Sequence, residues 1–274
     1  MITDTISGDP QVNSTLRLLS YNIQVGITAT RYRDYIFHSW KHFLPYRNRM
    51  NNLKRIARMI KDFDVVGLQE LDSGSLRSGF INHAEYLAKM AEFPHWYDKT
   101  NRTLWKVARH SIGLLSKYAP IRISRHNLPA RVPGRSALMV QYGNQEDPLV
   151  LVLAHLSLSR KARIVQMEYV SELVRKYNHV VLMGDLNCGC DSSELSTFLK
   201  DADLRMPYSD LLTYPSWKPR KHIDHILVSP SIEIKSVQVL NCMISDHLPI
   251  AMEISLPENV FLPMGGRYNK IKAA

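Results

Sequence analysis

The chain has 274 residues, of which 45% are hydrophobic and 22% charged, a composition typical of soluble globular proteins that excludes disorder over most of its length. No apolar run approaches the roughly 18 to 20 residues that a membrane-spanning helix needs. Residues 1–15 lack the apolar core of a signal peptide, so we expect a cytoplasmic protein. Lysine and arginine outnumber the acids by 35 to 25, a formal charge of +10, which favours a polyanionic partner such as nucleic acid or an acidic lipid surface.

Hydrophobic periodicity divides the chain into buried strands and amphipathic helices. Strands and helices alternate early and late, whereas short turns join several strand pairs. Mixed sheets with helices outside them, a layered α/β sandwich, are therefore expected. The predicted strands cover residues 16–22, 63–70, 111–116, 120–124, 149–155, 179–183, 226–229 and 250–255, and the predicted helices 48–60, 82–90, 163–177 and 193–199.

The chain shows no internal repeat and no linker rich in glycine, serine or proline, which predicts one domain. Residues 1–15 are expected to form a polar leader without structure of its own. The single domain should extend over residues 16–256. Residues 257–274 are expected to form a loose, basic C-terminal tail.

Residues 27–46 form an insert rich in aromatic and basic side chains, including Trp40 and Tyr46. It either faces the substrate, stacking on bases or lying on lipid head groups, or is a helical excursion packed on the body. Apolar residues at helical spacing then predict a helix with one buried face. That face holds Met50, Leu53, Ile56, Ala57 and Ile60, and the solvated face holds Arg49, Lys54, Arg55, Arg58 and Lys61.

The stretch from His179 to Asn187 is the most informative part of the chain. Its apolar run breaks at Gly184 and then presents Asp185 and Asn187. On an extended backbone, residues two apart point the same way, so the carboxylate and the amide would face one space. That pair suits the orientation of a water molecule near a phosphate and a metal. A strand followed by an Asx turn would give the same residues.

Glu70 places a carboxylate at the end of another apolar run. An unpaired buried charge is costly, so this side chain needs a partner. A hard divalent cation is one such partner, because magnesium binds few carboxylates together with waters and phosphate oxygens. A salt bridge is the alternative.

Six separate strand ends carry polar side chains of this kind. No serine, cysteine or lysine is placed as an obvious nucleophile, so water is the expected attacker. Acids able to hold a metal, together with two histidines, point to metal-assisted hydrolysis of a phosphate ester. The strand ends offer Asn22, Glu70, His155, Asp185 with Asn187, Asp224, and Asp246 with His247.

As an ordered set, these residues resemble the endonuclease/exonuclease/phosphatase superfamily. The superfamily contains DNase-like nucleases, abasic-site endonucleases, poly(A) deadenylases, neutral sphingomyelinases and inositol polyphosphate 5-phosphatases. The resemblance covers nearly the whole chain, from about residue 16 to 255. It rests on Ser20-Tyr21-Asn22, Gln69-Glu70, His155-Leu156-Ser157, Gly184-Asp185-Leu186-Asn187, Ile223-Asp224-His225 and Ser245-Asp246-His247.

The resemblance implies a four-layer α/β sandwich, two packed mixed β-sheets flanked by helices, with the active site along their shared edge. It also implies Mg²⁺ or Mn²⁺ held chiefly by Glu70, with Asn22 and Asp246 near the ion. Asp185, helped by Asn187, would orient or deprotonate the attacking water. His247, paired with Asp224, would stabilise the charge that develops on the phosphoryl group. His155 would be a second donor to the same oxygens.

The chain departs from parts of the family pattern. Abasic-site endonucleases usually carry a tyrosine and an asparagine where this chain has His155 and its neighbours, which disfavours that narrow assignment. Ser111 stands where an amide is usual. We expect Ser111, Arg135, Tyr214 and Trp217 to bind substrate.

Two enzyme functions and one non-enzyme function stay open. A nuclease would use the basic excess to hold a phosphate backbone, with Trp40, Trp217 or Tyr214 stacking on bases. A lipid or inositol phosphoesterase would use it on an acidic head group, with the 27–46 insert on the membrane. A catalytically inactive binding module is disfavoured, because every expected acid and histidine is present. The charge makes a nuclease the first choice, and no obligate protein partner is evident.

Overall fold

The computed structural model describes residues 15–26, 47–104, 108–131, 134–206, 208–257, 260 and 262. Residues 1–14 of the expected leader and the 27–46 insert, with Trp40 and Tyr46, lie outside the described residues. Within the described ranges, no helix has the length and apolar character needed to cross a membrane.

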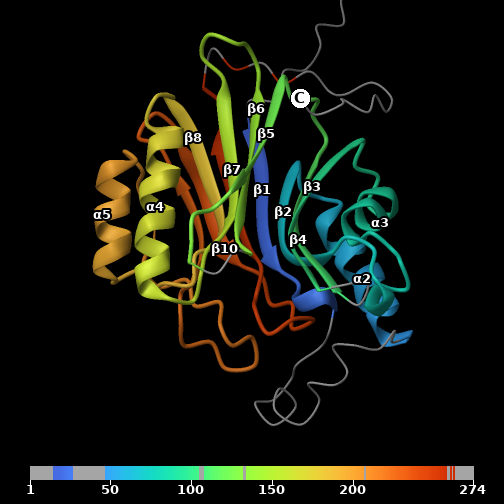
Figure 1. Cartoon of the computed structure of the whole chain (residues 1–274). Coiled ribbons are helices and arrows are strands. Elements are labelled where there is room, and N and C mark those ends of the chain that lie inside the picture. The colour runs from blue at the N-terminus through green and yellow to red at the C-terminus, as the bar shows by residue number, and fades with distance from the viewer. Residues whose placement is uncertain are drawn as a thin grey trace, which may run out of the picture.

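Two β-sheets pack face to face at the centre, and helices cover their outer faces (Figure 1). Apolar side chains from both sheets, including Leu18, Leu151 and Met183, fill the space between them. The arrangement is the expected four-layer α/β sandwich. The larger sheet is covered by α2 (Arg47–Ile60) and α3 (His83–Met90), and the smaller one by α4 (Arg160–Val174) and α5 (Ser193–Asp201).

Both sheets are mixed. In chain order the strands are β1 (Thr15–Asn22), β2 (Val65–Asp72), β3 (His95–Leu104), β4 (Ala108–Ser116), β5 (Arg122–Asn127), β6 (Ser136–Tyr142), β7 (Leu149–His155), β8 (His179–Asp185), β9 (Asp224–Val228), β10 (Ile234–Val239) and β11 (Ile250–Ser255). The six-stranded sheet has the order β10-β11-β1-β2-β4-β3, and β1 pairs parallel with β2 but antiparallel with β11. The five-stranded sheet has the order β5-β6-β7-β8-β9, and only β7 and β8 pair parallel in it.

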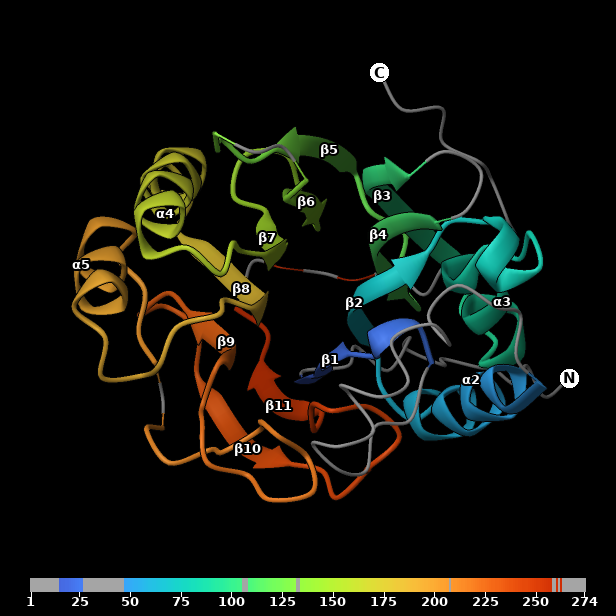
Figure 2. The same ribbon diagram turned by 60° about the horizontal axis from the view of Figure 1, so that its bottom comes forward.

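One edge of the sandwich collects the polar strand ends, and Figure 2 turns this edge towards the viewer. In the smaller sheet, Asp185 at the end of β8 pairs with His155 of β7 on one side and with Asp224 of β9 on the other. In the larger sheet, Asn22 at the end of β1 lies beside Gln69 of β2. Strand pairing therefore brings together side chains that are far apart in the sequence.

A β-bulge interrupts β2 at this edge. The register between β2 and β4 shifts between Leu68 and Leu71, and Glu70 in the bulge has a φ of 54°. A bulge redirects a side chain and bends its strand. The strand was expected to end at Glu70, but it continues to Asp72 beyond the bulge.

Several boundaries differ from the expectation. The helix expected at 163–177 begins at Arg160 and ends at Val174, and the strand expected at 63–70 begins at Val65. The sequence analysis did not predict β3, β6 or β10. At the sheet edges β3 and β10 lack a continuous apolar run, and the alternation in β10 is irregular. The pattern of a buried strand is therefore absent from them.

Two expectations about exposure are wrong. Arg49 was expected on the solvated face of its helix, yet only 2% of it is exposed. The loose tail was expected to begin at residue 257, but Val260 is buried in the core between the sheets and Leu262 packs against it. The core therefore extends beyond residue 256.

Candidate active site

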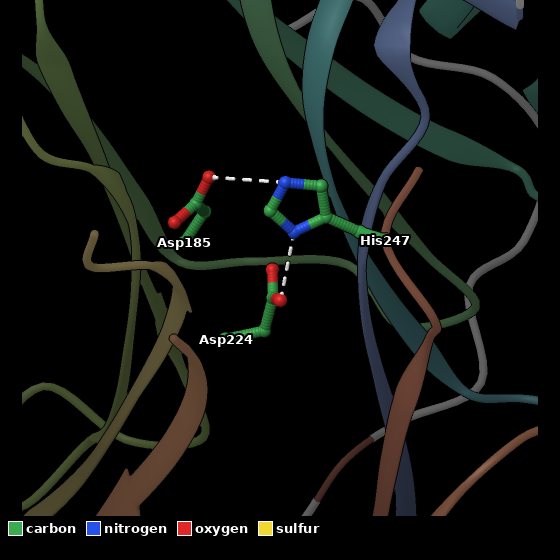
Figure 3. A group of neighbouring side chains, drawn as sticks. All are labelled: Asp185, Asp224 and His247. Carbon is green, nitrogen blue, oxygen red and sulfur yellow. Dashed lines mark hydrogen bonds and ion pairs between the residues drawn. The ribbon is translucent and has the colours of Figure 1, made fainter. Parts of the chain in front are cut away.

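Three side chains from different segments meet at the polar edge (Figure 3). Asp185 ends β8, Asp224 begins β9, and His247 lies in the loop before β11. All three are buried, and one ligand atom of each lies within 4.8 Å of the others. His247 joins the two acids, because its Nδ1 is 2.8 Å from Asp224 Oδ2 and its Nε2 is 3.9 Å from Asp185 Oδ2.

The environment of His247 favours its charged form. Burial acts to lower the pKa of His247, but the charge and hydrogen bond of Asp224, followed by the charges of Asp185 and Asp246, raise it to about 10. The Tyr214 ring lies against the imidazole, with 4.9 Å between the ring centroids. The imidazolium is thus held by one carboxylate while its other nitrogen faces a second.

Asp185 is positioned by close strand packing. It follows Gly184, whose φ is +146° and where an added Cβ would lie 1.8 Å from the Ala154 carbonyl oxygen, so only glycine fits. Asn22 Nδ2 donates to Asp185 Oδ2 at 3.0 Å, and the Asn187 backbone N–H donates to Oδ1 at 3.0 Å. The carboxylate is therefore fixed through both oxygens.

The pKa of Asp185 is raised to about 7. Burial is the largest cause, and the charges of Asp224 and Glu70 add to it, whereas His247 and the hydrogen bond from Asn22 act in the opposite direction. A carboxylate that titrates near neutrality can accept a proton from water, which an ordinary exposed aspartate does poorly.

Asn187 does not continue the strand as the extended-backbone interpretation required. Its φ is 54°, and its backbone N–H closes an Asx turn on Asp185. Its side-chain Nδ2 donates to the Leu156 carbonyl oxygen at 3.0 Å, which ties the ends of β7 and β8 together. Asn187 thus supports Asp185 and does not point beside it.

His155 is buried at the end of β7 with Arg135 against it. Arg135 Nη1 lies 3.0 Å from both ring nitrogens of His155, and His155 Nε2 lies 3.5 Å from Asp185 Oδ2. Burial, followed by the charges of Arg135 and His247, lowers the pKa of His155 well below its usual value. His155 is therefore a neutral ring beside a permanent cation.

Glu70 and Asp246 are suited to a divalent cation. Glu70 is partly buried, and its carboxylate has no hydrogen-bond or ion-pair partner among the residues that the structure describes. Burial raises the pKa of Asp246, and the charge of Glu70 raises it further, while Ser245 Oγ donates to Asp246 Oδ1 at 3.1 Å. A buried carboxylate beside a second carboxylate is the kind of oxygen ligand that a hard cation stabilises. These residues therefore fit the expected metal.

Two other residues, Ser111 and Trp217, were expected to bind substrate. Ser111 is buried in β4 opposite Leu71, next to the bulge that carries Glu70. Trp217 is partly buried in the loop before β9. The roles expected for the site residues from the sequence stay predictions.

Thr213 belongs to the site although the sequence did not indicate it. Thr213 Oγ1 donates to Asp224 Oδ2 at 2.5 Å, the same oxygen that binds His247 Nδ1. The Thr213 carbonyl oxygen also accepts from the Leu248 backbone N–H, so this residue links the segments of the acid and the imidazole. A threonine within a turn carries no sequence signal for such a contact.

Comparison with known families decides the family. The model of the Endonuclease/Exonuclease/phosphatase family matches residues 19–247. The chain belongs to this family. The match includes every predicted catalytic and metal-binding residue, from Asn22 to His247. No curated protein matches the chain.

Solved structures share the Endonuclease/Exonuclease/phosphatase fold. A member of the family from Beutenbergia cavernae is 19% identical with a TM-score of 0.68, over 90% of this chain and 72% of that one. One from Leptotrichia buccalis is 17% identical with a TM-score of 0.69, over 88% and 100%. A mannosyl-6-phosphatase from Bacteroides thetaiotaomicron is 18% identical with a TM-score of 0.63, over 88% and 100%. At these identities the likeness concerns the fold alone.

Proposed function

We propose that the protein is a divalent-metal-dependent phosphodiesterase that uses water as the nucleophile and nucleic acid as the substrate. The arrangement of Asp185, His247 and Asp224 carries this proposal. It sets a carboxylate with a pKa near neutrality 3.9 Å from an imidazole nitrogen whose partner nitrogen is held by a second acid. A base and a cationic donor facing one space are what hydrolysis of a phosphate ester requires.

Glu70 would hold the cation, with Asp246 and Asn22 beside it. When bound, the cation neutralises charge on the phosphoryl oxygens as a Lewis acid. Oxygen ligands of this type suit Mg²⁺ or Mn²⁺. Family membership and a Glu70 carboxylate without a hydrogen-bond or ion-pair partner among the described residues support this part of the proposal.

The side chains of the site would accept the proton of water, donate hydrogen bonds to the phosphoryl group and hold one another in place. Asp185 accepts the proton of the attacking water at Oδ2, while the contacts from Asn22 and Asn187 keep the carboxylate aimed. Protonated His247 donates from Nε2 to a phosphoryl oxygen, and Asp224 keeps its ring in place. Neutral His155 and the Arg135 guanidinium supply further donors, and Arg135 brings the positive charge of that pair.

The choice of nucleic acid rests on the formal charge of +10, which attracts a phosphate backbone. The mannosyl-6-phosphatase among the similar structures supports phosphate ester chemistry but favours no particular ester. A lipid or inositol phosphoesterase is the competing substrate class.

A panel of substrates tests the proposal. We expect Mg²⁺- or Mn²⁺-dependent hydrolysis of single- or double-stranded DNA, RNA or a small chromogenic diester, with Glu70→Ala as the inactive blank. Glu85→Ala, on the exposed side of α3, is the matched control and should keep full activity. If only sphingomyelin or inositol phosphates are hydrolysed, a lipid or inositol phosphate ester replaces nucleic acid as the substrate. If no ester is hydrolysed, the proposed phosphodiesterase function is contradicted.

A further inference from the structure

The exposed face of the C-terminal half of α2 is basic. Its apolar side chains Leu53, Ile56, Ala57 and Ile60 are buried against the larger sheet. The opposite face exposes Lys54, Arg55 and Arg58, and Lys61 extends it beyond the helix end. At 100° per residue, these four bases fall within about a third of the helix circumference. Residues 47–61 contain no acid, and the first acid after them is the exposed Asp62.

This face is unfavourable for the isolated helix. The pairs Lys54–Arg58, Arg55–Arg58 and Arg58–Lys61 are three or four residues apart, and like charges at those spacings destabilise a helix. None of these four bases makes an ion pair with another residue in the described ranges. The first turn also lacks an acid to match the helix dipole.

Two other helices show the usual arrangement. In α3 an acid, Glu85, lies in the first turn and a base, Lys89, in the last. In α5 the corresponding residues are Glu194 and Lys200. The charge pattern of α2 is therefore not a general property of this basic chain.

The helix that carries the basic face is tied to the segment that follows β1, the strand that ends at Asn22. Asn52 Nδ2 donates at 3.0 Å to the carbonyl oxygen of Gly26, four residues after Asn22. The buried face of α2 packs on β1 and β2, the strands that carry Asn22 and Glu70 (Figure 2). From Lys54 to Lys61 the face extends for about 10 Å. Phosphates follow one another about every 3.4 Å along the axis of a DNA strand, so this length matches about three of them.

We infer that the exposed face of α2 binds the phosphate backbone of a nucleic acid substrate whose scissile bond lies at the Asp185 site. The choice of this polyanion rests on the proposed function. A membrane surface fits α2 less well, because an interfacial helix inserts its apolar face into lipid and the apolar face of α2 is buried in the core.

Binding of a labelled 30-nucleotide single strand and the matching duplex, measured in EDTA so that no cleavage occurs, tests the inference. One variant carries Lys54→Gln, Arg55→Gln, Arg58→Gln and Lys61→Gln. Its matched control carries Lys161→Gln, Arg175→Gln, Lys176→Gln and Lys200→Gln, four exposed bases on or next to α4 and α5 across the molecule (Figure 1). Both variants lower the net charge by four.

We expect the α2 variant to bind at least about tenfold more weakly than the control at low salt. Its log–log salt slope should be shallower by about two to three, while hydrolysis of the small diester stays unchanged. Equal weakening by both variants would overturn the inference, because charge alone would then explain binding. So would α2-dependent binding to phosphatidylserine vesicles without binding to nucleic acid.

The substitution Lys54→Glu separates binding from folding. It places an acid four residues before Arg58, so we expect the thermal midpoint to stay or rise while nucleic acid binding weakens. A fall in both would contradict a binding role. Failure of the wild-type protein to hydrolyse any diester would refute the proposed function, whereas loss of the α2 effect alone would refute only this inference.

Discussion

Asp72 and Asp185 are both buried aspartates at the ends of strands, yet their surroundings differ. The Asp72 carboxylate accepts from neutral groups of its own loop and of β4, namely Gly74 N at 3.0 Å, Ser75 N at 2.8 Å, Ser75 Oγ at 2.7 Å, Ser78 Oγ at 2.9 Å and Arg109 N at 3.4 Å. Asp185 accepts two hydrogen bonds and also faces His247, Asp224 and Glu70. A carboxylate that accepts many hydrogen bonds from its own loop organises that loop, whereas a buried carboxylate that faces several ionisable groups can exchange protons.

The largest expected effect is on the chemistry of Asp185. We predict that Asp185→Asn lowers the turnover of the small diester by at least about 100-fold, because the amide cannot accept the proton of water. The thermal midpoint should stay or rise, since the substitution removes a carboxylate whose ionised form is disfavoured by burial. Turnover and thermal unfolding measured on one preparation check both parts. Near-normal turnover would reject the role assigned to Asp185.

For Asp72 the expected effect is on stability. We predict that Asp72→Ala lowers the free energy of unfolding by about 3 kcal/mol, because several buried donors lose their acceptor. Urea denaturation measures this change. Asp98→Ala is the control, since among the described residues the Asp98 carboxylate accepts side-chain bonds from Ser73 and Asn82 alone, in a partly buried site, and should cost less. An equal cost for both variants would show that the hydrogen bonds to Asp72 add no particular stability.

Two buried histidines, His225 and His247, differ in the same way, and the difference affects how the stability of the fold depends on pH. Burial, followed by the neighbouring His222, lowers the pKa of His225 to about 4, whereas that of His247 is raised. In the unfolded chain His225 has the ordinary pKa of about 6.5. Between about pH 4 and 6.5 the unfolded state therefore binds more protons than the folded state does. Stability should therefore fall as the pH drops from about 6.5 to 4.

The variant His225→Gln should lose less stability between about pH 6.5 and 4 than the wild-type protein does, by on the order of 1–3 kcal/mol in the free energy of unfolding. Urea denaturation at several pH values measures it. Some slope should remain, because the pKa values of His155 and His222 are lowered in the same direction. An unchanged slope would show that His225 is not the group that titrates.

The smallest expected effect belongs to Thr213. We predict that Thr213→Val lowers turnover by about fivefold, because Asp224 loses the hydrogen bond of a hydroxyl group, worth about 1 kcal/mol, and orients His247 less firmly. Thr213→Ser keeps the hydroxyl and should restore turnover. If the valine variant matches the wild-type protein, or serine fails to rescue it, Thr213 does not act through this bond.

The sequence predicted the parts of the site that follow buried strands. Asp185 and His155 end apolar runs whose burial the structure confirms, and the register of the smaller sheet brings them together. The bulge at Glu70 could not be predicted, because a positive φ in a non-glycine residue follows from the pairing of β2 with β4. For the same reason Arg49, which helical periodicity placed in solvent, is buried by tertiary packing.

Mn²⁺ binding, followed by electron paramagnetic resonance, tests the proposed metal site without knowledge of the substrate. We predict that Mn²⁺ binds the wild-type protein and the Glu85→Ala control with similar affinity. We also predict that Glu70→Gln weakens binding at least about tenfold, because the principal carboxylate ligand is lost. Equal affinity for the wild-type protein and Glu70→Gln would contradict the proposed metal site.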